Sequence, residues 1–200
     1  MRVRQVHGNV VRVLKRGEVA ASANRERPDG DAVVSNQPGL VLAVMVADCV
    51  PVLVVDRDGG AAAAIHAGWR GTCARVVVAA IERMRDKFGT TPGNLLAAIG
   101  PSIGPADYKV GNSLIEQFRS AGHDPADIAR WFPHINAALH LDLWLANRDQ
   151  LIAAGLSPDR IFTSRLSTLP HRDVFDSYRR DGESAGRMAG LIVVPKPGAA

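Results

Sequence analysis

The chain has 200 residues, of which 46% are hydrophobic and 22% charged, and this balance is typical of a soluble protein with a sizeable core. Its net charge of +4 comes from scattered arginines without interleaved aromatic residues, so we expect no nucleic-acid partner. No apolar run approaches the roughly 20 residues of a membrane-spanning helix, and 2 cysteines cannot form a disulfide framework, so we expect a cytoplasmic protein with no membrane partner.

Short apolar runs dominate the first half of the chain. They follow a polar segment, residues 24–30, that contains Pro and Gly and predicts an exposed loop. The runs are rich in Val, Leu and Ala and are bounded by Pro-Gly, Pro and Asp-Gly-Gly turn signals. They predict strands over residues 31–36, 40–47, 52–56 and 61–66.

Helical patterns begin only after these strands. Residues 72–88 predict a helix with Thr72 as its N-cap, Lys87 in its last turn and Gly89 at its end. Because several strands precede the first helix, we predict an α+β fold with mixed β-sheet layers flanked by helices, in a single domain over residues 1–200. The remaining predicted elements are strands at 95–99, 160–163 and 188–194 and helices at 112–121 and 143–154.

The turn signal Asp-Arg-Asp-Gly-Gly at residues 56–60 predicts an antiparallel hairpin between two of the strands. With the turn centred near residues 57–58, the numbers of two paired residues add up to about 115–117. The numbers of Cys49 and His66 add up to 115, so these residues should lie near one another at the open end of the hairpin. Side chains directly opposite one another lie about 5 Å apart at Cβ. A thiolate and an imidazole at that separation suit zinc.

His7 is the expected third ligand, because the remaining histidines lie in the more polar second half of the chain. Two histidines and one cysteine leave a fourth position open for water or substrate, which is the catalytic pattern for zinc. Each residue alone also fits a structural role, as a packed thiol or a hydrogen-bonded histidine. Asp48 stands beside Cys49 at the end of an apolar run, where a carboxylate is costly unless it is paired or functional.

The segment from His66 to Thr72 predicts an anion site. Arg70 comes just before the predicted helix, where free backbone N–H groups and a guanidinium together would hold a phosphate. The glycine loop at residues 100–105 and the pair Arg179 and Arg180 could line the same pocket. A simple turn and two solvated side chains are the alternatives for these two features.

Six segments in this order resemble the multicopper polyphenol oxidase (laccase-domain) family, whose members are mostly described as purine nucleoside phosphorylases. The resemblance covers nearly all of the chain and implies that His7, Cys49 and His66 bind zinc. It also implies phosphorolysis of adenosine, inosine and methylthioadenosine, adenosine deamination, a role in editing peptidoglycan precursors and a cysteine-hydrolase-like architecture. The segments are Gln-Val-His-Gly at 5–8, Ala-Asp-Cys-Val-Pro-Val at 47–52, His-Ala-Gly-Trp-Arg-Gly at 66–71, Gly-Pro-Ser-Ile-Gly at 100–104, Leu-Asp-Leu-Trp with Ala-Asn-Arg within 141–148, and Ser-Tyr-Arg-Arg-Asp at 177–181.

Three departures from the family pattern bear on substrate specificity. Family members usually carry a further N-terminal stretch before the Gln-Val-His-Gly segment, whereas this sequence begins almost at that segment. A mis-assigned start, a shortened chain and a variant that lacks the stretch are the alternatives. The segment at residues 166–171 has no cysteine where the family usually has one, and Asp176 stands where an aromatic residue is usual. None of the three changes touches the expected zinc ligands.

Together these features predict a zinc-dependent purine nucleoside phosphorylase with adenosine deaminase activity. Zn²⁺ would activate water or orient phosphate, and Cu²⁺ is a second metal that this ligand set accepts. Asp48 and Arg70 are the predicted catalytic residues, with Asp48 moving a proton to or from the base. Substrate contacts are predicted for Arg70, Gly100, Ser102 and Arg179.

Two other functions stay open from the sequence. Cys49 could be a nucleophile with His66 as its base, in an amide hydrolase or editing enzyme. A lone copper in the same site could support polyphenol oxidation, although the 6 histidines form no His-x-His pair of the kind that multicopper centres use. The expected partners are a purine nucleoside and phosphate, and we expect a monomer.

Overall fold

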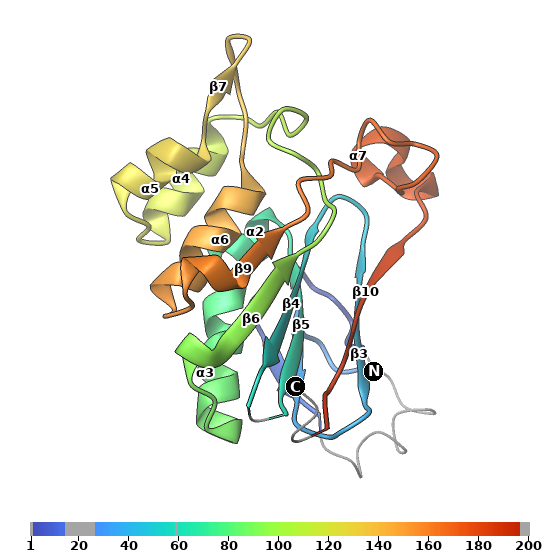
Figure 1. The fold of residues 1–200 in the computed structure, drawn as a ribbon. Coiled ribbons are helices and arrows are strands. Elements are labelled where there is room, and N and C mark those ends of the chain that lie inside the picture. The colour runs from blue at the N-terminus through green and yellow to red at the C-terminus, as the bar shows by residue number, and fades with distance from the viewer. Residues whose placement is uncertain (1, 15–26, 59, 197–200) are drawn as a thin grey trace.

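A mixed six-stranded sheet forms the centre of the molecule (Figure 1). The structure is a computed structural model that describes residues 2–14, 27–58 and 60–196. The inner pairs β2–β5, β5–β4 and β4–β6 are antiparallel, and the edge pairs β1–β2 and β6–β9 are parallel. In spatial order the strands are β1 (Val11–Val13), β2 (Ala32–Ser35), β5 (Ala62–Ala67), β4 (Val50–Asp56), β6 (Leu95–Ile99) and β9 (Ile161–Thr163).

The central sheet is covered on both faces (Figure 1). On one face lie the helices α2 (Trp69–Cys73), α3 (Val76–Phe88) and α6 (Leu143–Ala153). On the other face lies a second sheet of two antiparallel strands, β3 (Val41–Val46) and β10 (Met188–Val193). The result is three layers, in the order helices, sheet, sheet.

Strand β5 shows how the sequence fits this sandwich. Successive residues of a strand point to opposite faces, and Ala63 and Ile65 pack in the core beneath the helices while Ala62 and Ala64 pack against β3 and β10. All six residues of β5 are buried. An all-apolar run of mostly alanines is therefore required here, because both faces are covered and the layers approach closely.

The remaining elements lie around this sandwich. Figure 1 shows helices α4 and α5 outside α6, the β7–β8 hairpin beyond them and α7 near the start of β10. No helix in the described part of the chain combines the length and apolar composition needed to cross a membrane. The bounds are α4 (Ser113–Ser120), α5 (Pro125–Trp131), β7 (His134–Ile135), β8 (Ala138–Leu139), α7 (Tyr178–Asp181) and the 3-10 turns η2 (Pro92–Asn94), η3 (Pro158–Arg160) and η4 (Gly182–Ser184).

The predicted α+β fold with mixed sheets and flanking helices is confirmed. The helix predicted over residues 72–88 is wrong at its start, because Arg75 adopts a left-handed conformation with φ of 58° and divides the segment into α2 and α3. Thr72 is therefore no N-cap. It lies inside α2, where its buried hydroxyl accepts a hydrogen bond from Asn147. Of the loop predicted at residues 24–30, the first three residues lie outside the described part of the chain.

Candidate functional site

The β4–β5 hairpin brings Cys49 and His66 together at its open end. Pro51 pairs with His66 and Val50 with Ala67, so Cys49, one residue before β4, lies opposite the residue that follows β5, Gly68. The predicted proximity is confirmed, with a register two residues away from direct pairing. A Cβ atom at Gly68 would lie 2.7 Å from Cys49 Sγ, so only glycine leaves room for the thiol.

His7 completes a cluster of three metal-ligating side chains. One ligand atom from each of His7, Cys49 and His66 lies within 4.8 Å of the other two. The imidazole rings meet edge to face, with centroids 4.8 Å apart and an interplanar angle of 79°. His66 is buried, Cys49 half-buried and His7 exposed, so the cluster opens toward solvent on one side. Two imidazoles and a thiolate at this spacing could hold a metal ion and leave one coordination position free.

Asp31 organises both histidines of the cluster. This fully buried carboxylate accepts hydrogen bonds from His66 Nδ1 at 2.9 Å and from the His7 backbone N–H at 2.8 Å. Its second oxygen accepts the N–H groups of Gly8 at 2.6 Å and Val6 at 3.3 Å. Because Nδ1 of His66 is engaged by the carboxylate, Nε2 is the nitrogen left for a metal. The turn that carries His7, whose φ is 60°, is held by the same group.

Burial and partners shift the pKa values in this cluster in opposite directions. Burial opposes ionisation of Cys49, but hydrogen bonds from His66 and His7 prevail and lower the pKa of the thiol to about 7. Burial also opposes protonation of His66, but the hydrogen bond to Asp31 and the contact with Cys49 raise its pKa to about 9. The thiol is thus prepared to be a thiolate, which is the form that binds metals and attacks electrophiles.

A cavity of about 760 Å³ adjoins the cluster. Aromatic rings hold two of its cationic side chains in place. The guanidinium of Arg70 lies 4.3 Å from the ring centroid of Trp69, and that of Arg179 lies 5.1 Å from the ring centroid of Tyr108. Burial first, and the neighbouring thiolate of Cys49 second, raise the pKa of Tyr108 to about 12, so its hydroxyl keeps its proton and can donate a hydrogen bond.

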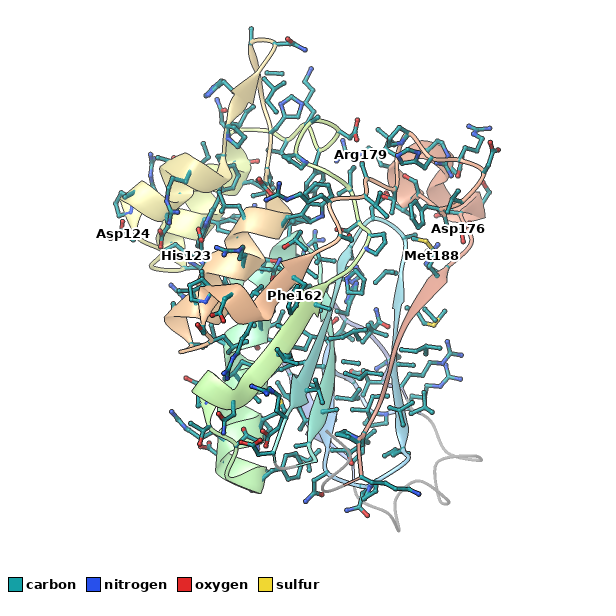
Figure 2. The ribbon with its side chains drawn as sticks, in the orientation of Figure 1. His123, Asp124, Phe162, Asp176, Arg179 and Met188 are labelled. Atoms are coloured by element: carbon teal, nitrogen blue, oxygen red, sulfur yellow. The ribbon has the colours of Figure 1, made fainter. Side chains whose placement is uncertain are left out.

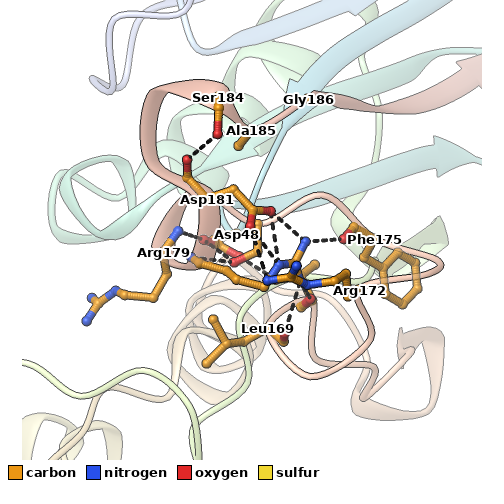
Figure 3. A network of polar contacts seen from close by, with 12 residues as sticks. Asp48, Leu169, Arg172, Phe175, Arg179, Asp181, Ser184, Ala185 and Gly186 are labelled. Atoms are coloured by element: carbon orange, nitrogen blue, oxygen red, sulfur yellow. Dashed lines mark hydrogen bonds and ion pairs between the residues drawn. The ribbon is translucent and has the colours of Figure 1, made fainter.

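Asp48 binds the C-terminal segment at residues 168–179 and holds it beside this cavity (Figure 3). Its carboxylate accepts hydrogen bonds from Thr168 Oγ1 at 2.5 Å, Ser177 Oγ at 3.0 Å and the Arg179 backbone N–H at 2.6 Å. Asp48 is buried and its φ is 79°. The predicted cost of a carboxylate at this position is offset by three donors, and both oxygens are engaged. The proton-transfer role of Asp48 stays a prediction.

Arg179 and Arg180 have different environments. The largely buried Arg180 donates to the carbonyls of Thr168, Leu169 and Phe175 and pairs with Asp181, so it holds the loop before α7. Arg179 lines the cavity, and its substrate contact stays a prediction. Figure 2 shows Arg179 at the end of the molecule where α7 lies.

Arg70 lines the cavity, but not at the predicted helix start. Helix α2 begins at Trp69, so Arg70 lies in its first turn rather than before it. Gly100 and Ser102 are not among the residues lining the cavity. A Cβ at Gly100 would lie 2.8 Å from Pro51 Cγ, and the fully buried Ser102 hydroxyl accepts a hydrogen bond from Trp144. Both therefore pack the loop, and their predicted substrate contacts gain no support from the cavity.

Sequence reasoning missed Asp31, Tyr108 and Gln5. The available signal for Asp31 was its position directly before a strand that is buried on both faces. Asp48 has a similar position, at the end of another apolar run. The Gln5 side chain exchanges two hydrogen bonds with the backbone of Met45 on the edge of β3, which anchors the segment leading to His7. No local pattern predicts such a pairing across 40 positions.

Residues 1–195 match the family model described as multi-copper polyphenol oxidoreductase laccase. A Bacteroides thetaiotaomicron protein named purine nucleoside phosphorylase is 42% identical over 166 residues, which are 83% of this chain and 61% of that protein. A protein named adenosine deaminase RL5, from an unknown prokaryotic organism, is 40% identical over 157 residues, 78% of this chain and 59% of that protein. This chain thus spans about three fifths of the length of these curated relatives. The crystal structure of the Bacillus licheniformis hypothetical protein YfiH resembles it with a TM-score of 0.87 at 31% identity, covering 96% of this chain and 73% of that one.

Proposed function

The chain belongs to the multi-copper polyphenol oxidoreductase laccase family, and from that premise we propose that it is a zinc-dependent purine nucleoside phosphorylase. The observation that carries the proposal is the cluster of His7, Cys49 and His66 beside a cavity that also presents Arg70 and Arg179. Relatives named purine nucleoside phosphorylase and one relative named adenosine deaminase point to the same substrate class, purine nucleosides. Adenosine, inosine and methylthioadenosine are the proposed substrates.

The donor set supports zinc. Two imidazoles and one thiolate whose ligand atoms lie within 4.8 Å of one another match the three-ligand zinc sites of enzymes. The hydrogen bond that His66 Nδ1 donates to Asp31 orients the His66 ring, and a side chain at Gly68 would displace the thiol. When bound, zinc would supply a Lewis acid that polarises a substrate oxygen. Copper accepts the same ligands, so the identity of the metal is part of what the experiment below measures.

The arginines of the cavity are proposed to hold the attacking phosphate. Guanidinium groups match phosphate oxygens in pairs, and the stacking of Arg70 on Trp69 and of Arg179 on Tyr108 fixes their planes before phosphate arrives. In phosphorolysis one phosphate oxygen forms a bond to the anomeric carbon of the ribose. The bond from that carbon to the purine nitrogen breaks, and its electron pair leaves with the purine, which takes up a proton.

Asp48 is proposed to act by positioning Arg179. Both of its oxygens accept protein hydrogen bonds, one of them from the Arg179 backbone, so an anchoring role accounts for all of its contacts. The protonated hydroxyl of Tyr108 is a candidate donor toward the base or ribose. The rings of Trp69, Tyr108 and Tyr178 give the cavity flat apolar surfaces on which a purine can stack.

Adenosine deamination is proposed as a second activity of the same site, because one relative that is 40% identical is named adenosine deaminase. The proposed unit is a single laccase-type domain over residues 1–200, supported by the family match over residues 1–195. A cysteine-hydrolase-like architecture, a monomeric state and a cytoplasmic location stay predictions. The molar mass from light scattering after size-exclusion chromatography tests the predicted monomeric state.

The proposal is tested by zinc quantification together with turnover of adenosine and phosphate, with adenine, inosine and hypoxanthine separated afterwards. Cys49→Ala is expected to lose both zinc and turnover. Cys73→Ala is the matched control, because Cys73 contacts the Gln117 carbonyl rather than the cavity, and it should keep both. Full phosphorolysis by zinc-free Cys49→Ala, or no turnover by the zinc-loaded parent chain, would overturn the proposal. Copper with phenol oxidation, or amide hydrolysis by metal-free protein, would support the alternatives instead.

A further inference from the structure

Four further arginines line the cavity and have no part in the phosphorolysis proposed above. We refer to them as the outer arginines; they are Arg2, Arg4, Arg27 and Arg187. Asp48 is the one carboxylate lining the cavity among the residues that the structure describes, and its oxygens are already engaged. Arg4 pairs with Asp29. The cavity therefore carries more positive charge than a single phosphate ion neutralises.

The outer arginines converge on the end of strand β3. Met188 pairs with Val46, so Arg187, one residue before β10, lies beside that end of the strand. On the other edge the side chain of Gln5 bonds to the backbone of Met45, which places Arg4 there. Figure 2 shows Met188 on the same side of the molecule as Arg179.

Arg2 and Arg27 lie on adjacent segments. A parallel bridge joins Arg4 to Asp29, and Arg2 and Arg27 each stand two residues before that bridge. Neither makes an ion pair with any residue in ranges 2–14, 27–58 and 60–196. Like charges on neighbouring strands repel one another. An anion between them removes that repulsion and gains charge-assisted hydrogen bonds.

Among the described residues, only neutral groups hold Arg187 in place. Its guanidinium donates to the carbonyls of Ala185 at 2.7 Å and Gly186 at 2.8 Å and lies 5.8 Å from the ring centroid of Tyr178. Asp176 packs against Gly186 but forms no ion pair with Arg187 in the described part of the chain. The charge of Arg187 is thus oriented without being neutralised, which suits a ligand that brings its own negative charge.

We infer that the outer arginines bind a second phosphate group, carried by the nucleoside itself, so that the substrate class includes nucleoside 5′-monophosphates. This inference rests on the proposed function. A cavity of about 760 Å³ falls within the usual range for sites that enclose a whole small-molecule ligand. The bond changes remain those of phosphorolysis, and the monoester takes no part in them. The products of such a substrate are the free purine and ribose 1,5-bisphosphate.

Binding of AMP and adenosine to the zinc-loaded chain, measured by titration calorimetry, tests the inference. AMP is expected to bind on the order of tenfold more tightly than adenosine, because it adds charge-assisted hydrogen bonds. The preference should persist in saturating sulfate, an unreactive phosphate analogue that occupies the Arg70 and Arg179 site. Arg187→Gln and Arg27→Gln should reduce the ratio of the two dissociation constants toward one. Arg83→Gln, an exposed arginine of α3 outside the cavity, is the matched control and should leave the ratio unchanged.

Equal affinity for AMP and adenosine would overturn the inference while leaving phosphorolysis of adenosine intact. Loss of the preference in sulfate would also overturn it, because AMP would then be using the cosubstrate site. A preference that survives both Arg187→Gln and Arg27→Gln would overturn it as well, since the metal or the general charge would then be responsible. A preference that both variants abolish, in a chain that splits neither compound, would support the subsite and refute the proposed function.

Discussion

Replacing Asp31 by Asn tests whether one buried carboxylate organises the metal cluster. One oxygen of Asp31 accepts from His66 Nδ1 and His7 N, and the other accepts from Gly8 N and Val6 N. An asparagine has one acceptor oxygen, so in either orientation its amide nitrogen faces two N–H donors. A buried donor left without a partner costs about 1–3 kcal/mol. We therefore expect a loss of about 2–6 kcal/mol in unfolding free energy, because two donors are affected.

The Asp31→Asn substitution should also lower the affinity for zinc. Loss of the carboxylate partner of a metal-bound histidine typically costs roughly 10–100-fold in metal affinity. Competition with a chromophoric chelator measures the affinity, and urea unfolding of the metal-free protein measures the stability. Asp86→Asn is the control, because Asp86 is exposed on α3 and should change neither quantity. Unchanged zinc affinity in a folded Asp31→Asn protein would refute the positioning role of this residue.

Three further predictions concern the same region. Gly68→Ala should weaken zinc binding, because its Cβ would lie 2.7 Å from Cys49 Sγ, whereas Gly93→Ala, with nothing within 4 Å, should not; equal affinities in a chelator competition would contradict this. In metal-free protein the alkylation rate of Cys49 should rise with pH through about 7 and then level off, because its pKa is lowered to that value; a rate still rising at pH 9 would show an ordinary thiol. Asp48→Asn should speed hydrogen exchange in α7, measured by mass spectrometry, because Arg179 N loses its carboxylate acceptor; unaltered exchange there would show that the anchor is dispensable.

The strands and the hairpin were predictable because their signals are local. Runs of Val, Leu and Ala between turn residues specify buried strands, and the Asp-Arg-Asp-Gly-Gly turn set the pairing of β4 with β5 to within two residues. The break at Arg75 was not predictable, since a left-handed arginine between two helical turns has no sequence signature. The segment instead reads as one continuous helix.

The part of the site that lies within one hairpin was predictable. The part that depends on contacts between distant segments of the chain was not. Cys49 and His66 belong to one hairpin, whereas the carboxylate of Asp31 reaches His66 across 35 positions. For Asp48 the sequence indicated an unusual buried acid but not its partners, which lie 120 to 131 positions away. Such contacts depend on how the layers pack, and periodicity within one segment carries no information about that.

The order of the ligands along the chain has a consequence for assembly during synthesis. The three proposed metal ligands all lie within the first 66 residues, whereas the group that Asp48 holds in the cavity comes from Arg179, 131 positions later. Contacts across so long a stretch of chain close late, because the entropy of a long loop must be lost first. A growing chain can therefore gather its metal-binding side chains once β5 has emerged, well before it has a surface for substrate. Binding of the proposed metal would then report that the first half of the chain has folded, and the proposed activity would report that the whole chain has folded.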